Sequence, residues 1–167
     1  MFNTKCTAVI LTLIDFRSSG LLHRNFIKIY LVNYFLAKSE PLVYSISDLE
    51  RDKTTTWDGI KSPQALQSVR AMRPKDRVFI YHSGGESRIV GIAEVISEPR
   101  TDPEEPKSAV VDLRFLHKLE PPTTLSEVKT SNLFNDWALV RQSRLSTMPM
   151  PPNVVAWMKK RYPKLRL

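Results

Sequence analysis

Apolar runs bounded by turn residues predict four strands in the middle of the chain. They span residues 34–37, which end ahead of Pro41, and residues 77–81, 89–96 and 109–116. Two consecutive glycines separate the second run from the third, which predicts a hairpin. In the fourth run apolar and charged residues alternate, as in a strand with one buried and one solvated face. The pattern therefore predicts a sheet that covers a core and is curved and partly closed.

Capping signals predict two helices between these runs. Ser45 and Asp48 have the spacing of a capping box, which predicts a short helix through residue 51. Ser62 and Pro63 place an N-cap and an N1 proline ahead of a helix over residues 64–72. The apolar residues that share one face of this helix are Ala65, Leu66, Val69 and Met72. The second helix is therefore expected to pack on the sheet.

The last third of the chain continues the mixture of helix and strand signals. Prolines at 121–122 and the capping pattern over residues 124–127 predict the start of a helix. Residues 135–140 form a further short helical segment, and residues 144–148 return as a strand. Prolines at 151–152 begin the final helix. The chain is thus predicted to be a small α+β domain.

Residues 1–32 differ in pattern from the rest of the chain. Their apolar stretch is interrupted by charged residues and is too short to span a membrane. We expect an N-terminal extension that is disordered or comes from an upstream start assignment, with a transit peptide as the alternative. The folded domain is expected over residues 33–167.

Composition fits one globular domain, because 42% of the 167 residues are hydrophobic and 25% are charged. Cys6 is the single cysteine, so the chain has no internal disulfide and no cysteine-based zinc site. This fits a reducing compartment, and we expect a cytoplasmic protein of bacterial type without cofactor or metal.

The net charge of +8 is concentrated toward the ends of the chain. From Arg141 to Leu167 there are seven basic residues and no acidic one. Such a gradient predicts contact with a polyanion. The alternative is a solubilising helix whose basic end complements its own dipole.

Several separated motifs, in fixed order, resemble those of EVE domains. The motifs are Tyr34-Phe35-Leu36-Ala37-Lys38-Ser39-Glu40-Pro41, Tyr44-Ser45-Ile46, Trp57-Asp58-Gly59-Ile60, Tyr81-His82-Ser83, Ile89-Val90-Gly91-Ile92-Ala93-Glu94-Val95, Val111-Asp112-Leu113 and Leu139-Val140-Arg141 with Arg144-Leu145-Ser146. The resemblance implies a PUA-like fold, a small curved β-barrel of about five to six strands flanked by helices. It also implies a non-catalytic module that reads a modified base in DNA or RNA.

The resemblance and the neighbouring charges point to two groups of site residues. Trp57 is the candidate stacking platform, with core packing as the structural alternative. The candidate base-binding residues are Ser39, Trp57, Asp58, Tyr81, His82 and Ser83, and the candidate phosphate-binding residues are Lys38, Lys61, Arg141 and Arg144. One departure matters: residues 61–65 read Lys-Ser-Pro-Gln-Ala where many family members carry Arg-Asn-Tyr-Gln-Ala. The base preference of relatives is therefore not carried over.

Two alternative functions remain open at this stage. Ser39, His82 and Asp58 are the residue types of a hydrolase triad, and a PUA-like enzyme of the ASCH type would act on modified nucleosides. The chain has no nucleophile elbow, HExxH motif or phosphate-binding glycine loop in support. The other alternative is a protein-interaction adaptor with an exposed surface, for which core packing is the competing interpretation. The residues of that surface would be Trp137, Trp157, Pro149, Pro151 and Pro152.

Overall fold

The computed structural model describes residues 31–165, and its folded unit begins at Asn33. The expected N-terminal extension lies outside the described residues, apart from its last two positions. Within the described part of the chain, no helix is both long and apolar enough to cross a membrane.

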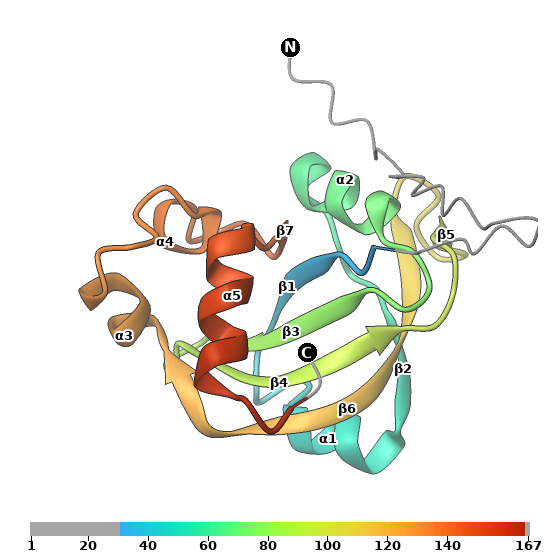
Figure 1. Ribbon diagram of the computed structural model, residues 1–167. Coiled ribbons are helices and arrows are strands. Elements are labelled where there is room, and N and C mark those ends of the chain that lie inside the picture. The colour runs from blue at the N-terminus through green and yellow to red at the C-terminus, as the bar shows by residue number, and fades with distance from the viewer. Residues whose placement is uncertain (1–30, 166–167) are drawn as a thin grey trace, which may run out of the picture. The chain divides into compact units, whose positions relative to one another are not determined.

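The domain contains both strands and helices, with four consecutive strands in its middle (Figure 1). The strands are β1 Tyr34–Ser39, β2 Thr54–Trp57, β3 Arg77–His82, β4 Arg88–Val95, β5 Arg100–Thr101, β6 Ala109–Thr124 and β7 Thr147–Pro149. The helices are α1 Ile46–Asp52, α2 Pro63–Ala71, α3 Leu125–Thr130, α4 Ala138–Arg141 and α5 Pro152–Arg161.

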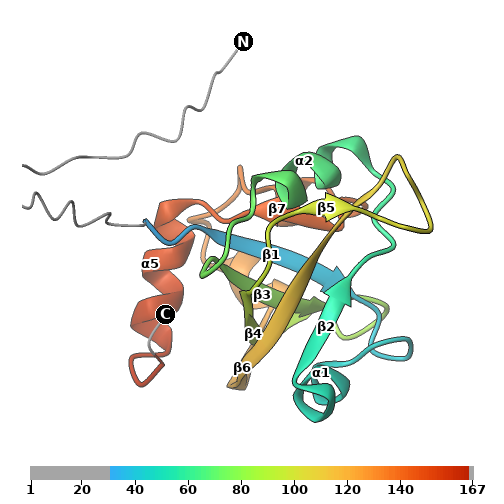
Figure 2. The ribbon, with the colours of Figure 1, turned by 90° about the vertical axis from the view of Figure 1, so that its right-hand side faces the viewer.

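The described strands form one sheet in the order β2-β6-β4-β3-β1-β7, and the short β5 pairs with β6. The pairs are antiparallel except for β1 and β3, which run parallel. Register shifts interrupt the β3–β4 and β4–β6 ladders, and such irregularities increase twist and bending. The sheet curls, and the helices lie around it (Figures 1 and 2). This confirms the predicted α+β class and the predicted curvature of the sheet.

Both capping boxes are confirmed. The Ser45 hydroxyl accepts the backbone N–H of Asp48 at 3.2 Å, and the Asp48 carboxylate accepts the N–H of Ser45 at 2.9 Å. Thr124 and Glu127 form the same reciprocal pair at the start of α3. The predicted apolar face of α2 is buried as well, which holds that helix against the sheet. These features depend on residues three or four positions apart, so the sequence is sufficient to reveal them.

Three strand assignments from the sequence need correction. β2 was not predicted, because it consists mostly of a polar threonine run without apolar alternation. β6 does not stop at residue 116 but continues through both prolines to Thr124. Those prolines fall within the irregular part of the β4–β6 ladder, where missing N–H donors cost least. β7 begins three residues later than predicted and is shorter.

Gly91 of β4 packs against Ile46, the first residue of α1. A Cβ at Gly91 would contact Ile46 Cδ1, would lie 2.6 Å from Ile46 Cγ1, and would lie 3.0 Å from the backbone oxygen of His117. Ile46 itself is 7% exposed. The side chain of Ile46 therefore occupies the space that the missing Cβ leaves, and Gly91 sets how closely α1 approaches the strands.

Candidate nucleic-acid interface

A cavity of about 450 Å³ opens between the end of β1 and the end of β2. It is lined by Lys38, Ser39, Glu40, Val43, Tyr44, Thr55, Thr56, Trp57, Asp58, Gly59, Ile60 and Ser146. Three strands separate β1 from β2 in the ladder, so only the curl of the sheet brings them to one cavity (Figure 2). We call this cavity the seam pocket.

Ser39 ends β1, where β3 still pairs with it on one side and β7 no longer pairs with it on the other. β7 pairs with residues 35–37 only, so its ladder stops short of Ser39. The Ser39 carbonyl accepts the backbone N–H of Ser83 at 2.9 Å and the Ser83 hydroxyl at 3.1 Å. Its own hydroxyl oxygen is buried and has no hydrogen-bond partner within the described residues. A buried hydroxyl without a partner at the wall of a pocket is a position where a ligand atom would gain a hydrogen bond.

Two aromatic residues line the seam pocket. Trp57 ends β2, is one of the lining residues and is 8% exposed. Tyr44 is half-buried, and its hydroxyl donates to the Asp52 carboxylate at 3.1 Å. Burial raises the pKa of the Tyr44 hydroxyl, which keeps the phenol neutral at physiological pH. Asp58 follows Trp57 and is exposed at the mouth, where its carboxylate remains available as an acceptor.

Tyr81, His82 and Ser83 are not among the residues that line the seam pocket. His82 is 4% exposed, and both ring nitrogens are engaged. Nε2 accepts the backbone N–H of Ile46 at 3.0 Å, so the ring proton is on Nδ1, which lies 2.8 Å from the Glu86 carboxylate. His82 therefore holds the first turn of α1. Tyr81 is 4% exposed, and its ring centroid lies 5.8 Å from the Lys38 ammonium.

The four candidate phosphate contacts follow a path next to the seam pocket. Arg141 and Arg144 line a second cavity, of about 400 Å³, together with Ser62, Gln64, Gln142, Ser143 and Leu145. Lys61 is exposed on the segment that connects the two cavities. Lys38 joins them in space, because it lines the seam pocket while its ammonium donates to the Ser143 carbonyl at 2.9 Å.

The four basic side chains along this path differ in whether other protein groups already engage them. Burial lowers the pKa of the Lys38 ammonium, which also contacts backbone carbonyls. Arg141 pairs with Asp136 at 2.8 Å, and both side chains are largely exposed. Among residues 31–165, no ion pair engages Arg144. Lys61 is exposed and likewise has no ion pair among these residues, so Arg144 and Lys61 are the side chains of this path most available to an incoming anion.

Several lining residues were not predicted as site residues. They include the turn between β1 and α1, the threonines of β2, and Ser146. Tyr44 had a signal, because it stands in one of the motifs that resemble EVE domains. Ser146 also stands in such a motif, but its place beside the pocket depends on the backbone hydrogen bond from the Lys38 N–H to its carbonyl at 2.8 Å, which no local pattern reveals.

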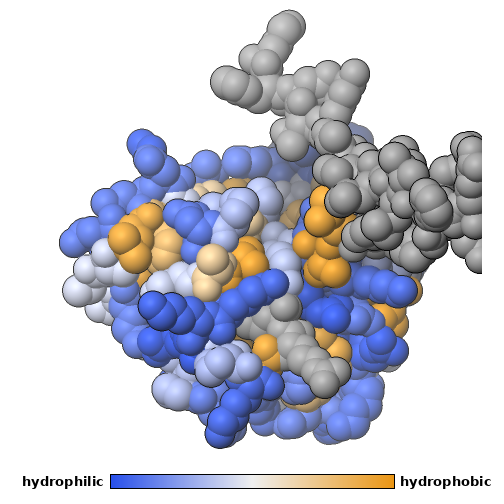
Figure 3. All heavy atoms as spheres, in the orientation of Figure 1, coloured by the Kyte–Doolittle hydropathy of each residue, from blue (hydrophilic) through white to orange (hydrophobic). Residues whose placement is uncertain are grey.

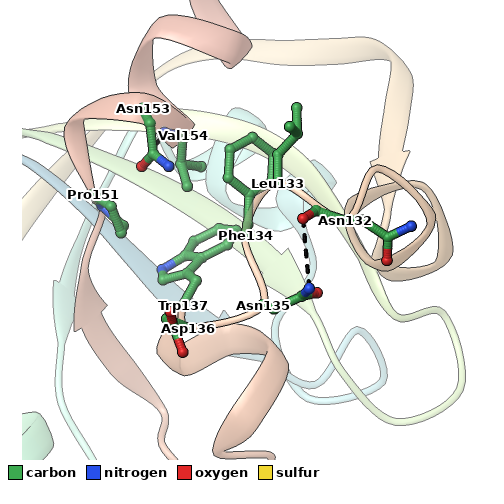
Figure 4. A pocket seen from close by; sticks show the side chains of 9 residues that line it. All are labelled: Asn132, Leu133, Phe134, Asn135, Asp136, Trp137, Pro151, Asn153 and Val154. Atoms are coloured by element: carbon green, nitrogen blue, oxygen red, sulfur yellow. Dashed lines mark hydrogen bonds between the residues drawn. The ribbon is translucent and has the colours of Figure 1, made fainter.

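A third cavity, of about 310 Å³, lies away from these residues, between the α3–α4 connection and the start of α5 (Figure 4). Trp137 lines it and is 3% exposed, and Trp157 packs edge-on against Phe134 with ring centroids 5.4 Å apart. On the face that carries α5, apolar side chains form separate small groups among hydrophilic ones (Figure 3). The two tryptophans of the adaptor alternative therefore serve in packing.

Among the described residues, no three His, Cys, Asp or Glu side chains lie close enough together to hold a metal ion.

Comparison with known proteins identifies the family. The EVE domain model matches residues 33–160. The chain belongs to the EVE domain family. Thymocyte nuclear protein 1 of Rattus norvegicus is 31% identical to this EVE domain protein over 156 residues, which cover 72% of the chain and 69% of the relative. The human thymocyte nuclear protein 1 is 29% identical over 156 residues with the same coverage.

Solved structures agree with this assignment. A Rhodopseudomonas palustris protein determined by NMR is 36% identical, has a TM-score of 0.74, and covers 81% of this chain and 97% of its own. A crystal structure of the human THYN1 protein holds DNA that contains 5-methylcytosine. That structure is 24% identical, with a TM-score of 0.69 and coverage of 77% of this chain and 96% of its own, and it supports the EVE fold described above.

Proposed function

We propose that this EVE domain binds DNA that carries a modified base and holds that base in the seam pocket. The observation that carries the proposal is the buried, unpartnered hydroxyl of Ser39 in a pocket walled by Trp57 and Tyr44. A cavity of about 450 Å³ has the size of known small-ligand sites, which range over about 300–1,000 Å³. The complex of human THYN1 with 5-methylcytosine DNA supports DNA as the polymer.

The roles of the lining residues follow from their chemistry. Removing a base from its stack costs a few kcal/mol, and contact with an aromatic face returns about 1–3 kcal/mol per base. Trp57 and Tyr44 provide such faces. The Ser39 hydroxyl donates to a ring nitrogen or carbonyl of the base, and the Asp58 carboxylate accepts from an exocyclic amine. The modification fills apolar space between these groups.

The phosphate contacts come from the basic path beside the pocket. Arg144 and Lys61 contact backbone phosphates, and Arg141 joins them by leaving its exposed pair with Asp136. Lys38 acts mainly on the protein side, since its ammonium holds the loop that carries these arginines. His82 and Ser83 position α1 and Ser39 rather than contact the base.

The proposal is tested with matched oligonucleotides, plain or carrying methyl, hydroxymethyl or bulkier base modifications, as DNA and as RNA. Wild-type protein should prefer one modified DNA over its plain counterpart at every salt concentration. Trp57→Ala should abolish the preference, and Ser39→Ala should reduce it about tenfold or less, as loss of one hydrogen bond predicts. Arg144→Ala should weaken all oligonucleotides alike and lower the salt slope by about one. Uniform wild-type affinity across the panel would refute the proposal.

Mass analysis of the recovered oligonucleotides separates a reader from an enzyme. A reader returns every oligonucleotide at its starting mass after prolonged incubation. Hydrolysis or removal of the modified base would change the mass, and would redirect Ser39 and Asp58 to catalytic roles.

A further inference from the structure

The turn between β1 and α1 presents its apolar side chains to water. Leu42 is 99% exposed and Val43 is 78% exposed, the two highest values among the large hydrophobic residues in the described part of the chain. Single exposed leucines are common on protein surfaces. Two adjacent apolar side chains at the tip of a turn beside a ligand pocket are a different observation, because burying them requires a partner.

The turn is held rigidly, so its exposure is built in. The backbone N–H groups of Val43 and Tyr44 both donate to the Glu40 carbonyl at 2.9 Å. Pro41 fixes its own φ angle on the side of β1. On the other side the turn leads into the Ser45 capping box, after which His82 holds the first helical N–H of α1. An apolar tip on such a frame loses little conformational freedom when it is buried.

The turn places its residues on two sides of the pocket mouth. Glu40, Val43 and Tyr44 line the seam pocket, whereas Leu42 between them does not. Leu42 therefore lies beside the mouth and outside it. A base that enters the seam pocket leaves a gap in the duplex from which it came, and that gap lies next to the pocket mouth. An apolar side chain that fills such a gap holds the neighbouring bases apart, covers their exposed faces and hinders the return of the base.

Taking the proposed function as given, we propose that Leu42, supported by Val43, is a wedge that inserts into the base stack at the position the modified base vacates. The target is accordingly double-stranded DNA, since a single strand has no continuous stack to hold open. Leu42 acts on the duplex, and the seam pocket acts on the base. The two contributions are separable by experiment.

The test compares Leu42→Ala with wild-type protein on a duplex and on a single strand that carry the same modified base. Leu133→Ala is the matched control, because Leu133 is 63% exposed and lies on the α3–α4 connection, away from the seam pocket. Leu42→Ala should lower duplex affinity by roughly tenfold or more, as loss of a buried leucine predicts, and leave single-strand affinity unchanged. Leu133→Ala should change neither affinity.

A second readout follows unstacking directly. A 2-aminopurine placed next to the modified base fluoresces more strongly when the stack opens. Wild-type protein at saturation should raise this signal, and Leu42→Ala at saturation should raise it less. If Leu42→Ala lost the same affinity for duplex and single strand, or lost none for either, the wedge proposal would be overturned. A preference of the wild-type protein for the modified base would in that case still support the seam pocket. Absence of that preference would overturn both.

Discussion

Substituting Gly91 tests whether α1, and with it the rim of the seam pocket, is positioned by contact with β4. Gly91→Ala places a Cβ 2.6 Å from Ile46 Cγ1 and 3.0 Å from the His117 backbone oxygen. The terminal methyl of Ile46 could rotate away, but Cγ1 moves only if the whole side chain changes rotamer or α1 shifts. The substitution therefore displaces the start of α1, which directly follows the turn at the pocket rim.

The expected cost follows from two opposing contributions. Overpacking a core costs about 1–3 kcal/mol, whereas replacing glycine by alanine inside a strand returns about 0.5–1 kcal/mol. The difference spans about 0–2.5 kcal/mol. Because the clash reaches Ile46 Cγ1, we expect a loss of about 1–2 kcal/mol, which at this chain length lowers the midpoint of thermal unfolding by about 2–8 °C. Urea unfolding followed by tryptophan fluorescence measures the loss, and the denaturant slope should stay constant.

A double-mutant cycle isolates the contact. Ile46→Ala removes both clashing carbons, so Gly91→Ala in that background should cost much less, with only the 3.0 Å approach to the His117 backbone oxygen left. Ile46→Val keeps Cγ1 and removes Cδ1, so it should relieve the clash only partly. The coupling expected between Gly91 and Ile46 is about 1–3 kcal/mol. Additive costs, or a Gly91→Ala protein as stable as wild type, would show that this contact does not position α1.

Two further changes probe the surroundings of the site. His82→Ala should lower the free energy of unfolding by about 1–3 kcal/mol, because the first N–H of α1 loses its acceptor; loss of base preference without loss of stability would instead make His82 a base contact. The hydrogen bond from Arg100 is the main cause that lowers the pKa of Asp112, whose ordinary value is 3.8. Stability from this carboxylate is therefore present above about pH 4 and lost as pH falls through the lowered pKa. Urea titrations should thus show a shallower acid loss in Asp112→Asn than in wild type, and identical acid limbs would contradict this role.

The parts of the fold that the sequence predicts are those with short-range causes. The capping boxes at Ser45 and Thr124 are readable because each links residues three positions apart. β2 was missed because an edge strand that pairs only with β6 needs no apolar alternation over Thr54–Thr56. The extension of β6 was missed because its prolines are tolerated only opposite an irregularity that the sequence of β4 does not reveal.

The site was predictable in kind but not in arrangement. Ser39, Trp57 and Asp58 come to one pocket through the curl of the sheet, which no local pattern encodes. His82 ends β3, as a pocket residue would end a strand, and the sequence gives no sign that both ring nitrogens are engaged by Ile46 and Glu86. Leu42, in the exposed turn after β1, belongs to no motif. A role for it can be inferred only from its position beside the seam pocket.

The short reach of β7 has a consequence for how this barrel responds to a ligand. β7 pairs with residues 35–37, and the end of β1 faces β2 without a ladder between them. A base held in the seam pocket would occupy the position that the closing strand has in a complete barrel. It would connect β1 with β2, at the other end of the sheet. Binding would then be measurable as slower hydrogen exchange in both β1 and β2, which share no ladder.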